Sequence, residues 1–485
     1  MENQNTQNYC LVIFGAKGDL ARRKLLPALY HLEKLKKLNN HFRIIGVARA
    51  TWNKHDYLLI VKKSLQHFLN EKINDLIWKN LSVRFDFCNL DVTELHQFSQ
   101  LKKIICNTNS LIINYFATPS NLFEPICAGL TSIQLNSMNS RIIIEKPIGN
   151  SLYTSNLINE KIGQYFQESQ IFRIDHYLGK ETLLNLPYLR FSNSILYNIW
   201  NKENIDHIQI TLSEKVGIEG RWNYFNQTGQ IRDMVQNHLL QILTIITMSQ
   251  PNNLTADNIR NEKVKILKSL RYMENQNFNK NIVIGQYKHG LFNGKILPGY
   301  TQENKITECS NIETFVAIKM FIDNMQWKNV PFYVRTGKRL SKKSSKIVLV
   351  FKKPINNLFN HVAQLSNKLI IRIEPNEGFE LEIFNKVPQV THKNILFNTK
   401  FNFSYDQSFP NYKLIGAYER LLLECINGNQ SLFVRRDEIE ESWKWIDSII
   451  LLLKNNNIIL HKYQSGSNGP SSAKDLIEVD NRFWI

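Results

Sequence analysis

The sequence lacks a long apolar run, a signal-like amino terminus and closely spaced cysteines, and each absence excludes a class of protein. The best candidate for a membrane span, residues 239–248, is interrupted by Gln241 and by threonines and is far shorter than the ~20 residues that a span needs. The first residues, MENQNTQNYC, are polar and include an acid, so we expect no secretory signal. The six cysteines show no C-x-x-C spacing, which argues against a zinc site or a disulfide scaffold. We therefore expect a cytoplasmic protein without a metal and without membrane association.

Acidic residues are also scarce relative to basic ones. The chain has 60 Lys and Arg against 42 Asp and Glu, a formal net charge of +18. Such a charge suits a nucleic-acid-binding protein, but it also steers anionic small molecules into a site. The lysines are spread along the chain with many asparagines rather than gathered in one patch, and the sequence contains no recognised RNA- or DNA-reading motif. We expect anionic small molecules, and no nucleic acid, as partners.

The amino-terminal region has the pattern of a dinucleotide-binding unit. Residues 9–14, YCLVIF, form an apolar run typical of a strand that is buried on both faces of a parallel sheet. A turn follows and leads into the helical sequence LARRKLLPALYHLEKL; it consists of Gly15, Ala16, Lys17, Gly18, Asp19 and Leu20. Strand, glycine turn and helix place backbone N–H groups against a pyrophosphate. The spacing is G-x-x-G-D-L rather than G-x-G-x-x-G, so a plain turn with a glycine at each corner is the alternative.

The next expected strand, residues 43–48, ends at Arg49. In dinucleotide-binding sheets this strand commonly ends with an acid that holds the ribose hydroxyls, and an acid would repel a 2′-phosphate. Here no acid appears until Asp56. Arginine in this place favours NADP over NAD.

Further strands are expected at residues 83–87, 111–116, 141–145 and 171–174, separated by helical spacers that indicate a parallel sheet. Polar or turn-forming residues follow three of these strands, in a series that suggests a ligand crevice: Asp91 and Val92; Ala117, Thr118 and Pro119; Glu145, Lys146 and Pro147.

The segment IFRIDHYLGKE, residues 171–181, has several potentially reactive or ligand-binding side chains close together in sequence. A short apolar strand is followed by Asp175, His176, Tyr177 and Lys180 before a helix begins at Glu181. Such side chains are rarely buried unless they are paired, so packing explains them poorly. A polar loop that merely caps the strand is the alternative.

Beyond residue 181 the pattern changes. A strand at residues 208–212 runs into Glu214, and a loop is expected over 217–229. An apolar helix over residues 233–248 carries Asp233, expected to be an N-terminal or capping residue, and His238. A histidine on such a helix is more often a core residue than a catalyst.

From residue 331 onward, strand follows strand with no long helix between them, which predicts a largely antiparallel sheet. The first of these strands leads to Lys338, and Lys343 follows in a lysine-rich loop. We predict two domains, a Rossmann-like α/β domain over residues 1–180 and an α+β domain over 181–485.

Several of these segments resemble glucose-6-phosphate dehydrogenase over nearly the whole chain. The resemblance rests on GAKGDLARRKLLP at 15–27, EKPIG at 145–149, RIDHYLGKE at 173–181, IRDMVQNHLLQ at 231–241 and RTGKRL at 335–340. RIDHYLGKE is highly specific to that family, whereas the glycine turn and EKP also occur in other sugar dehydrogenases. One departure is Asn468, at a position associated with tryptophan in the family.

The resemblance implies oxidation of D-glucose 6-phosphate at C1 to 6-phospho-D-glucono-1,5-lactone, with NADP as hydride acceptor. It implies that His238 is the general base and that Asp175 orients it. His176, Tyr177 and Lys180 would bind the 6-phosphate. Sugar hydroxyls would contact Glu214, Asp233, Lys338 and Lys343. Lys146 would lie between substrate and cofactor, and NADP would be held by the turn at 15–20 with Arg49.

The family resemblance also implies a homodimer or homotetramer, with the active site in a cleft between the two domains. Three other readings stay open: another sugar dehydrogenase that carries EKP, a nucleic-acid-binding protein, and a catalytically inactive NADP sensor.

Overall fold

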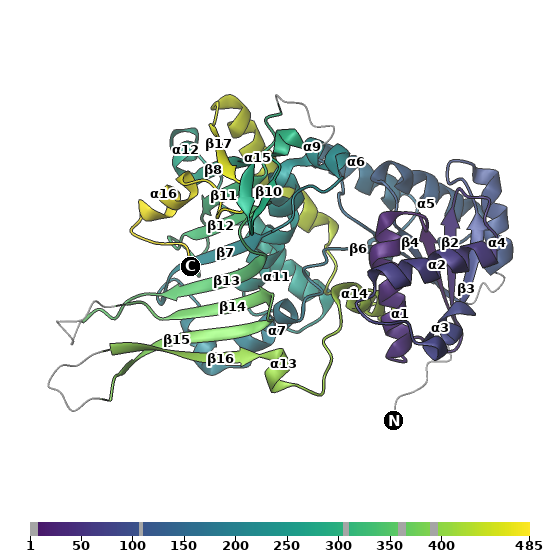
Figure 1. Ribbon diagram of the computed structural model, residues 1–485, viewed down its shortest axis with the longest axis horizontal. Helices are drawn as coiled ribbons and strands as arrows, with labels where there is room; N and C mark the ends of the chain where they lie inside the picture. The colour runs from purple at the N-terminus through teal and green to yellow at the C-terminus, as the bar shows by residue number, and fades with distance from the viewer. Residues whose placement is uncertain (1–7, 106–109, 304–309, 357–364, 389–395) are drawn as a thin grey trace. The chain divides into compact units, whose positions relative to one another are not determined.

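The computed structural model describes residues 8–105, 110–303, 310–356, 365–388 and 396–485, which belong to two compact units (Figure 1). The first unit comprises residues 1–179, 254–260 and 415–440, and the second comprises 180–253, 261–414 and 441–485. Cys106 and Cys309 lie outside the described residues, and the other four cysteines are buried and free. Within the described ranges, no helix is long and apolar enough to span a bilayer.

A parallel sheet with the strand order β3-β2-β1-β4-β5-β6 organises the first unit. Its strands are β1 (Tyr9–Phe14), β2 (Phe42–Ala48), β3 (Phe85–Asn89), β4 (Leu111–Phe116), β5 (Ser140–Ile144) and β6 (Ile171–Arg173). Strand β1 is buried along its whole length and pairs in parallel with both β2 and β4, so the strand order reverses beside it. Doubly wound sheets of this order bind ligands beyond the carboxyl ends of their strands at the reversal. The predicted Rossmann-like sheet is confirmed.

Helices separate these strands along the chain. They are η1 (Ala21–Leu25), α1 (Leu26–Lys34), α2 (Lys54–Phe68), α3 (Asp75–Ser82), η2 (Leu95–Gln97), α4 (Phe98–Ile105), η3 (Ser120–Leu122), α5 (Phe123–Ser132), α6 (Leu152–Gly163) and η4 (Glu168–Gln170). The strand predicted at residues 83–87 was placed two residues too early, because α3 continues to Ser82.

The segment 415–440 completes the first unit although it lies far along the chain. Leu421, Leu422 and Cys425 of α14 (Ala417–Asn427) belong to the same buried core as α1 and β1. The backbone N–H of Val434 donates to the carbonyl of Arg173, 3.0 Å away. Strand β6 is therefore held from both sides.

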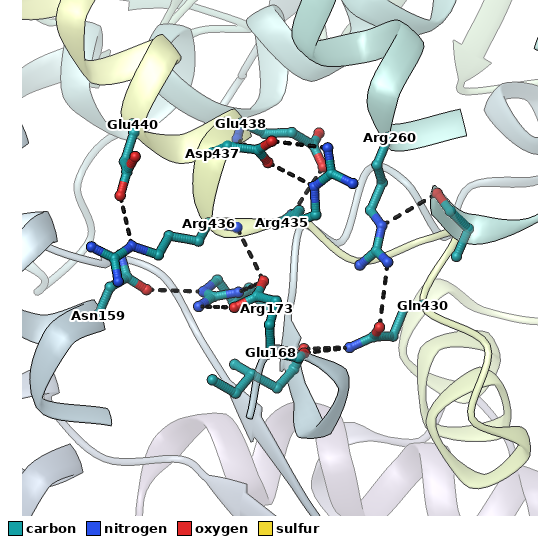
Figure 2. A network of polar contacts seen from close by, with 12 residues as sticks. Asn159, Glu168, Arg173, Arg260, Gln430, Arg435, Arg436, Asp437, Glu438 and Glu440 are labelled. Atoms are coloured by element: carbon teal, nitrogen blue, oxygen red, sulfur yellow. Dashed lines mark hydrogen bonds and ion pairs between the residues drawn. The ribbon is translucent and has the colours of Figure 1, made fainter. Parts of the chain in front are cut away.

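Arg173 lies at the centre of a polar network that fixes β6 (Figure 2). It is 1% exposed, its guanidinium donates to both carboxylate oxygens of Glu168 at 2.5 and 2.9 Å, and its Nε donates to Asn159 at 3.1 Å. Gln430 donates to the carbonyls of Glu168 and Ile171, each at 2.9 Å. The basic residue of RIDHYLGKE is thus structural, and it anchors the strand from which Asp175 and His176 follow.

A mixed sheet organises the second unit, with the order β16-β15-β14-β13-β7-β12-β11-β8-β17 (Figure 1). Its strands are β7 (Ile205–Ser213), β8 (Ile282–Lys288), β11 (Phe315–Met320), β12 (Phe332–Gly337), β13 (Ser344–Phe351), β14 (Lys368–Glu374), β15 (Gly378–Lys386), β16 (Leu396–Ser404) and β17 (Leu460–Gln464). Most neighbours are antiparallel, as predicted, but β12 pairs in parallel with β7, and β17 with β8.

The remaining elements are mostly helices. They are α7 (Glu181–Phe191), α8 (Ser194–Ile199), α9 (Trp222–Gln230), η5 (Ile231–Leu239), α10 (Leu240–Thr247), η6 (Asn275–Asn277), α12 (Phe278–Asn281), the hairpin β9 (Gly290–Phe292) and β10 (Lys295–Leu297), η7 (Tyr300–Gln302), α13 (Tyr405–Ser408) and α16 (Ser472–Glu478). Two helices, α11 (Ala256–Lys268) and α15 (Arg436–Asn455), share their residues between the two units.

The loop predicted over residues 217–229 was wrong in part, because α9 forms from Trp222 onward. Phe225 of this helix is buried in the core of the second unit together with Tyr300 and Phe315. Burial of an aromatic side chain outweighs the weak helix propensity of the local sequence. Gly229, with φ of +68°, then breaks the helix before η5 begins.

Candidate functional site

The glycine turn of the first unit packs closely against the backbone of β2 and of Ala117, which follows β4. The N–H groups of Gly15 and Ala16 both donate to the carbonyl of Val47 on β2, at 2.9 and 3.1 Å. Gly15 has a φ of +85°, and a Cβ there would lie 2.4 Å from the carbonyl oxygen of Ala117. Only glycine fits this position, and the turn leads directly into η1 and its helix N-terminus. The residues present therefore fit a dinucleotide pyrophosphate.

Two cations stand at the carboxyl edge of β1 and β2. The Arg49 side chain is 77% exposed, and its guanidinium lies 3.5 Å from the carboxylate of Asp91. Hydrogen bonds from Thr93 to the Asp91 carboxylate, together with the nearby Arg49, lower the pKa of Asp91 despite some burial. The Lys17 ammonium lies 5.8 Å from the ring centroid of Trp52. Arg49 and Lys17 thus offer positive charge at this edge of the sheet.

The residues after β4 lie against the turn. The N–H of Ala117 donates to the carbonyl of Phe14, 2.9 Å away, and Thr118 and Pro119 continue past this edge. Val92 follows Asp91 after β3. All of the cofactor residues predicted from the sequence therefore follow strands at one edge of the parallel sheet.

Strands β5 and β6 deliver the remaining candidates of the first unit. Lys146 follows two residues after β5 ends, and Asp175 follows two residues after β6 ends. Asp175 is buried and accepts a hydrogen bond from the N–H of Tyr177 at 2.9 Å. The ring of His176 lies 5.0 Å from the ring of Tyr177 and stacks at 6.4 Å on Tyr418 of α14.

In the second unit, Lys338 is the centre of an acid-lined cluster. Strands β7 and β12 are parallel neighbours, and the N–H of Glu214 donates to the carbonyl of Gly337 at 2.9 Å, so Glu214 and Lys338 leave the sheet side by side. The Lys338 ammonium is 1% exposed and lies 2.6 Å from Glu214 and 3.7 Å from Asp233. A buried ammonium needs such partners. The same groups offer both donors and acceptors to a polyhydroxylated ligand.

Asp233 lies in the first turn of η5, which confirms its predicted N-terminal position, and Gln230 is the residue at the N-cap. It accepts a hydrogen bond from the hydroxyl of Tyr224 at 3.1 Å. The N–H of Ile231 at the helix start instead donates to the carboxylate of Glu313 at 3.0 Å. The carboxylate of Asp233 therefore faces both Tyr224 and Lys338.

A second charged group lies farther along the same sheet edge. Lys343 precedes β13 and pairs with Glu374, the last residue of β14. Lys180 approaches the same carboxylate to 3.4 Å. Burial alone would raise the pKa of Glu374, but the hydrogen bond from Lys343 and the charge of Lys180 outweigh it and lower the pKa. Lys180 and Lys343, predicted for phosphate and sugar respectively, thus share one carboxylate.

The helix that carries His238 is mostly buried, and side chains from other elements bind the carbonyls at its carboxyl end. His238 lies near the end of η5, is 1% exposed, and its N–H donates to the side chain of Asn237. Helix α10 continues η5, and side-chain donors bind the carbonyls at its end. Arg190 donates to the carbonyls of Ile245 and Met248, each at 2.7 Å. Trp200 donates to the carbonyl of Ile246 and Trp327 to that of Thr247, each at 2.8 Å. A helix with its end fixed in this way holds its imidazole in one place.

Sequence reasoning missed several polar residues of these edges. Glu374 ends the run KLIIRIEP, where an acid at a strand end was an available signal. Tyr224 was hidden because α9 was taken for a loop. Tyr418 lies far along the chain and gives no local signal. The predicted pairing of Asp175 with His238, and the predicted cleft between domains, stay predictions, since the two residues belong to different units.

Comparisons with known proteins agree across the full length of the chain. A family model described as "Glucose-6-phosphate dehydrogenase, NAD binding domain" matches residues 12–185, and one described as "Glucose-6-phosphate dehydrogenase, C-terminal domain" matches residues 187–485. The glucose-6-phosphate 1-dehydrogenase of Dickeya dadantii (strain 3937) is 51% identical over 98% of this chain and 97% of its own length. That of Buchnera aphidicola subsp. Baizongia pistaciae (strain Bp) is 53% identical over 100% of both.

Solved structures agree as well. A glucose-6-phosphate dehydrogenase in complex with its substrate glucose-6-phosphate superposes with a TM-score of 0.91 at 32% identity, covering 100% of both chains. The enzyme from Mycobacterium avium gives a TM-score of 0.85 at 30% identity over 99% of both chains.

Proposed function

The chain belongs to the glucose-6-phosphate dehydrogenase family, and from this premise we propose how its residues divide the work and that NADP is its cofactor. The reaction is that of the family: oxidation of D-glucose 6-phosphate at C1 to 6-phospho-D-glucono-1,5-lactone, the first oxidative step of the pentose phosphate pathway, with a nicotinamide cofactor. The observation that best supports a sugar-binding role is the buried Lys338 between Glu214 and Asp233.

In the proposed mechanism, His238 accepts the proton of the C1 hydroxyl, and Asp175 orients the imidazole and stabilises its protonated form. Glu214, Asp233, Lys338 and Lys343 hold the sugar hydroxyls. A nicotinamide cofactor held beside Lys146 would supply the acceptor for the hydride that leaves C1. Lys146 holds substrate and cofactor in place, and the fixed helix end beyond His238 supports the base in one position.

The substrate's phosphate is assigned to His176, Tyr177 and Lys180. A phosphate dianion prefers clustered cationic and hydroxyl donors. Lys180 is supported in this role by its position beside Glu374, which keeps the ammonium at the sheet edge.

NADP is proposed as the cofactor because no acid ends β2. Its pyrophosphate would be held by the turn from Gly15 to Leu20, beside Ala117 to Pro119 and residues 91–92. The 2′-phosphate would be held by Arg49, with Lys17 as a second cation. The exposed guanidinium of Arg49 and the position of Lys17 over Trp52 support this assignment.

We further propose a cytoplasmic homodimer or homotetramer that acts without nucleic acid, membrane or metal. The buried free thiols of the four described cysteines suit a reducing compartment. Light scattering during size exclusion measures the mass of the assembly, and a monomer would contradict this proposal.

One assay tests the function. The protein is mixed with glucose 6-phosphate and NADP, then with NAD in place of NADP, then with unphosphorylated glucose, and nicotinamide reduction is followed by absorbance. We expect turnover that depends on the phosphate and is faster with NADP. Equal turnover on free glucose would instead indicate another sugar dehydrogenase, and no turnover would indicate a sensor or a binding protein.

A further inference from the structure

Glu145 carries a carboxyl group that the roles assigned above do not use. It is the first residue after β5, and the hydroxyl of Tyr115 on the neighbouring strand β4 donates to its Oε1 at 2.5 Å. The hydroxyl of Tyr418, on α14, donates to the same carboxyl group. Two phenol donors from two separate elements fix the orientation of one acid.

This acid stands among the candidate binding residues of the first unit. The charged groups that face it are Lys146, its neighbour in the chain, and Asp175, which follows β6. The ring of Tyr418 stacks on His176, with ring centroids 6.4 Å apart and planes within 15°. A contact chain therefore runs from Glu145 through Tyr418 to the imidazole assigned to the phosphate. The purely structural alternative is that Glu145 only accepts hydrogen bonds from the buried Tyr115 and the half-buried Tyr418.

We propose that Glu145 is a positioning residue, whose carboxylate, held between Tyr115 and Tyr418, fixes Lys146 and His176 so that this edge of the sheet binds the phosphorylated sugar. This inference rests on the proposed function, because it takes Lys146 and His176 as ligands of that substrate. It assigns no bond-making step to Glu145, which acts through its neighbours.

The protonation of Glu145 gives this role a pH signature. Burial raises the pKa of Glu145 to about 7, although hydrogen bonds from Tyr115 and Tyr418 and the charge of Lys146 oppose the rise, and the charge of Asp175 adds to it. Burial also raises the pKa of Tyr115 well above its ordinary value, so this phenol remains a donor. The Glu145 carboxylate that faces Lys146 is thus mostly present above pH 7 and mostly lost below it.

Glu145→Gln keeps the shape of the side chain and removes its charge. We expect KM for glucose 6-phosphate to rise about five- to ten-fold at pH 8 with kcat changed less than about three-fold, because a charge-assisted contact is lost from binding rather than from chemistry. At pH 6 about nine-tenths of the wild-type Glu145 is already protonated, so the variant and wild type should converge to within about two-fold. Calorimetric binding of glucose 6-phosphate without cofactor should give the same two ratios.

Tyr418→Phe is the second variant, because it keeps the ring against His176 and removes one donor. The hydrogen bond from Tyr418 lowers the pKa of Glu145, so its loss should move the pH at which binding weakens upward. Tyr57→Phe is the matched control: Tyr57 is buried in the same unit, and its hydroxyl has no hydrogen-bond partner among the described residues. It should leave KM unchanged at every pH.

A ratio between Glu145→Gln and wild type that is the same at pH 6 and pH 8 would overturn the inference and leave only the structural role. An unshifted pH dependence of KM in Tyr418→Phe would also overturn the inference. Tyr418→Phe decides the question if Glu145→Gln fails to fold. If the wild type reduces no cofactor, the proposed function fails, whereas calorimetry with the phosphorylated sugar still decides the role of Glu145.

Discussion

At the scale of single residues, the candidate site depends on ionisable groups whose charges are balanced locally. Lys338 is an ammonium with 1% exposure that persists because Glu214 and Asp233 surround it. Removing either acid would leave the buried ammonium with a single carboxylate partner, which is costly. Glu214, Asp233 and Lys338 stabilise one another and are also proposed to bind the sugar hydroxyls, so binding and stability are linked there.

His238→Asn should separate binding from chemistry. Asparagine retains a polar side chain but cannot accept a proton near neutral pH, so kcat should fall by about 10²–10⁴-fold while KM for glucose 6-phosphate changes little. Steady-state kinetics at saturating NADP measures both constants. Weakened binding with normal turnover would remove His238 from the role of base.

His207→Asn is the matched control for that variant. His207 is another buried histidine of the second unit, on β7, where its Nδ1 lies 2.6 Å from Asp206. Its replacement should lower the melting temperature while leaving kcat within a few-fold of wild type.

At the scale of elements, the helix made of η5 and α10 is fixed by side chains from other parts of the chain. Its first N–H groups are met by Glu313, and the carbonyls at its far end by Arg190, Trp200 and Trp327. Buried carbonyls without donors are costly, so these contacts decide where the helix ends. The helix therefore keeps a fixed position, with Asp233 and His238 on η5 and a buried, mostly apolar α10.

Trp327→Phe tests this capping. The indole N–H donates to the carbonyl of Thr247 at 2.8 Å, and phenylalanine fills most of the space without the donor. We expect a loss of about 1–3 kcal/mol in the free energy of unfolding and a melting temperature lower by a few degrees, because one buried carbonyl is left without a donor. Calorimetry measures the shift, and an unchanged melting temperature would show that the cap contributes nothing.

At the scale of the whole molecule, residues near the carboxyl terminus bind strands of the second unit that lie far away in sequence. Arg482 near the carboxyl terminus donates to both carboxylate oxygens of Asp206 on β7, at 2.8 and 3.0 Å, and to the hydroxyl of Tyr333 on β12 at 3.2 Å. Gln209 of β7 donates to the carbonyl of Phe483 at 2.7 Å. The end of the chain therefore holds together the two parallel strands that deliver Glu214 and Lys338.

Asp206→Asn should destabilise the protein in a pH-dependent way. Burial would raise the pKa of Asp206, but its hydrogen bonds with His207 and Arg482 outweigh burial and hold the pKa well below its usual range. A depressed pKa contributes stability that is present above the ordinary pKa of about 4 and is lost as the pH falls further. We expect a deficit of about 1–2 kcal/mol at neutral pH, after allowing for the partial exposure of Asp206, that is constant from pH 5 to 8 and shrinks below pH 4.

Melting temperatures of this variant and of wild type across pH 3.5–8 measure the deficit. Asp323→Asn is the control, because Asp323 also binds an arginine, Arg271, but lies exposed at the surface. A deficit that grows toward acid pH would contradict the assignment.

Local patterns predicted most of the strands and the edges they form. A parallel sheet places the carboxyl ends of all its strands at one edge. The apolar run before Gly15 and the polar residues after the strands therefore allowed this edge to be predicted from the sequence. The helix at α9 was not readable, since its local sequence favours a loop and only the burial of Phe225 makes it helical. The same holds for Tyr224 and Tyr418, whose polar contacts come from elements that no local pattern brings together.

The sequence by itself determined the two kinds of sheet, because periodicity is a local property of the chain. It also indicated the family and the residues proposed for catalysis, because motifs such as RIDHYLGKE resemble those of that family. Only the tertiary structure decided which charged groups find partners. Asp233 pairs with Lys338, Lys180 and Lys343 pair with Glu374, and two tyrosines donate hydrogen bonds to Glu145. The physical reason is that burial and partners set the cost of a charge. Both depend on which distant segments pack together, as the attachment of residues 415–440 to the first unit shows.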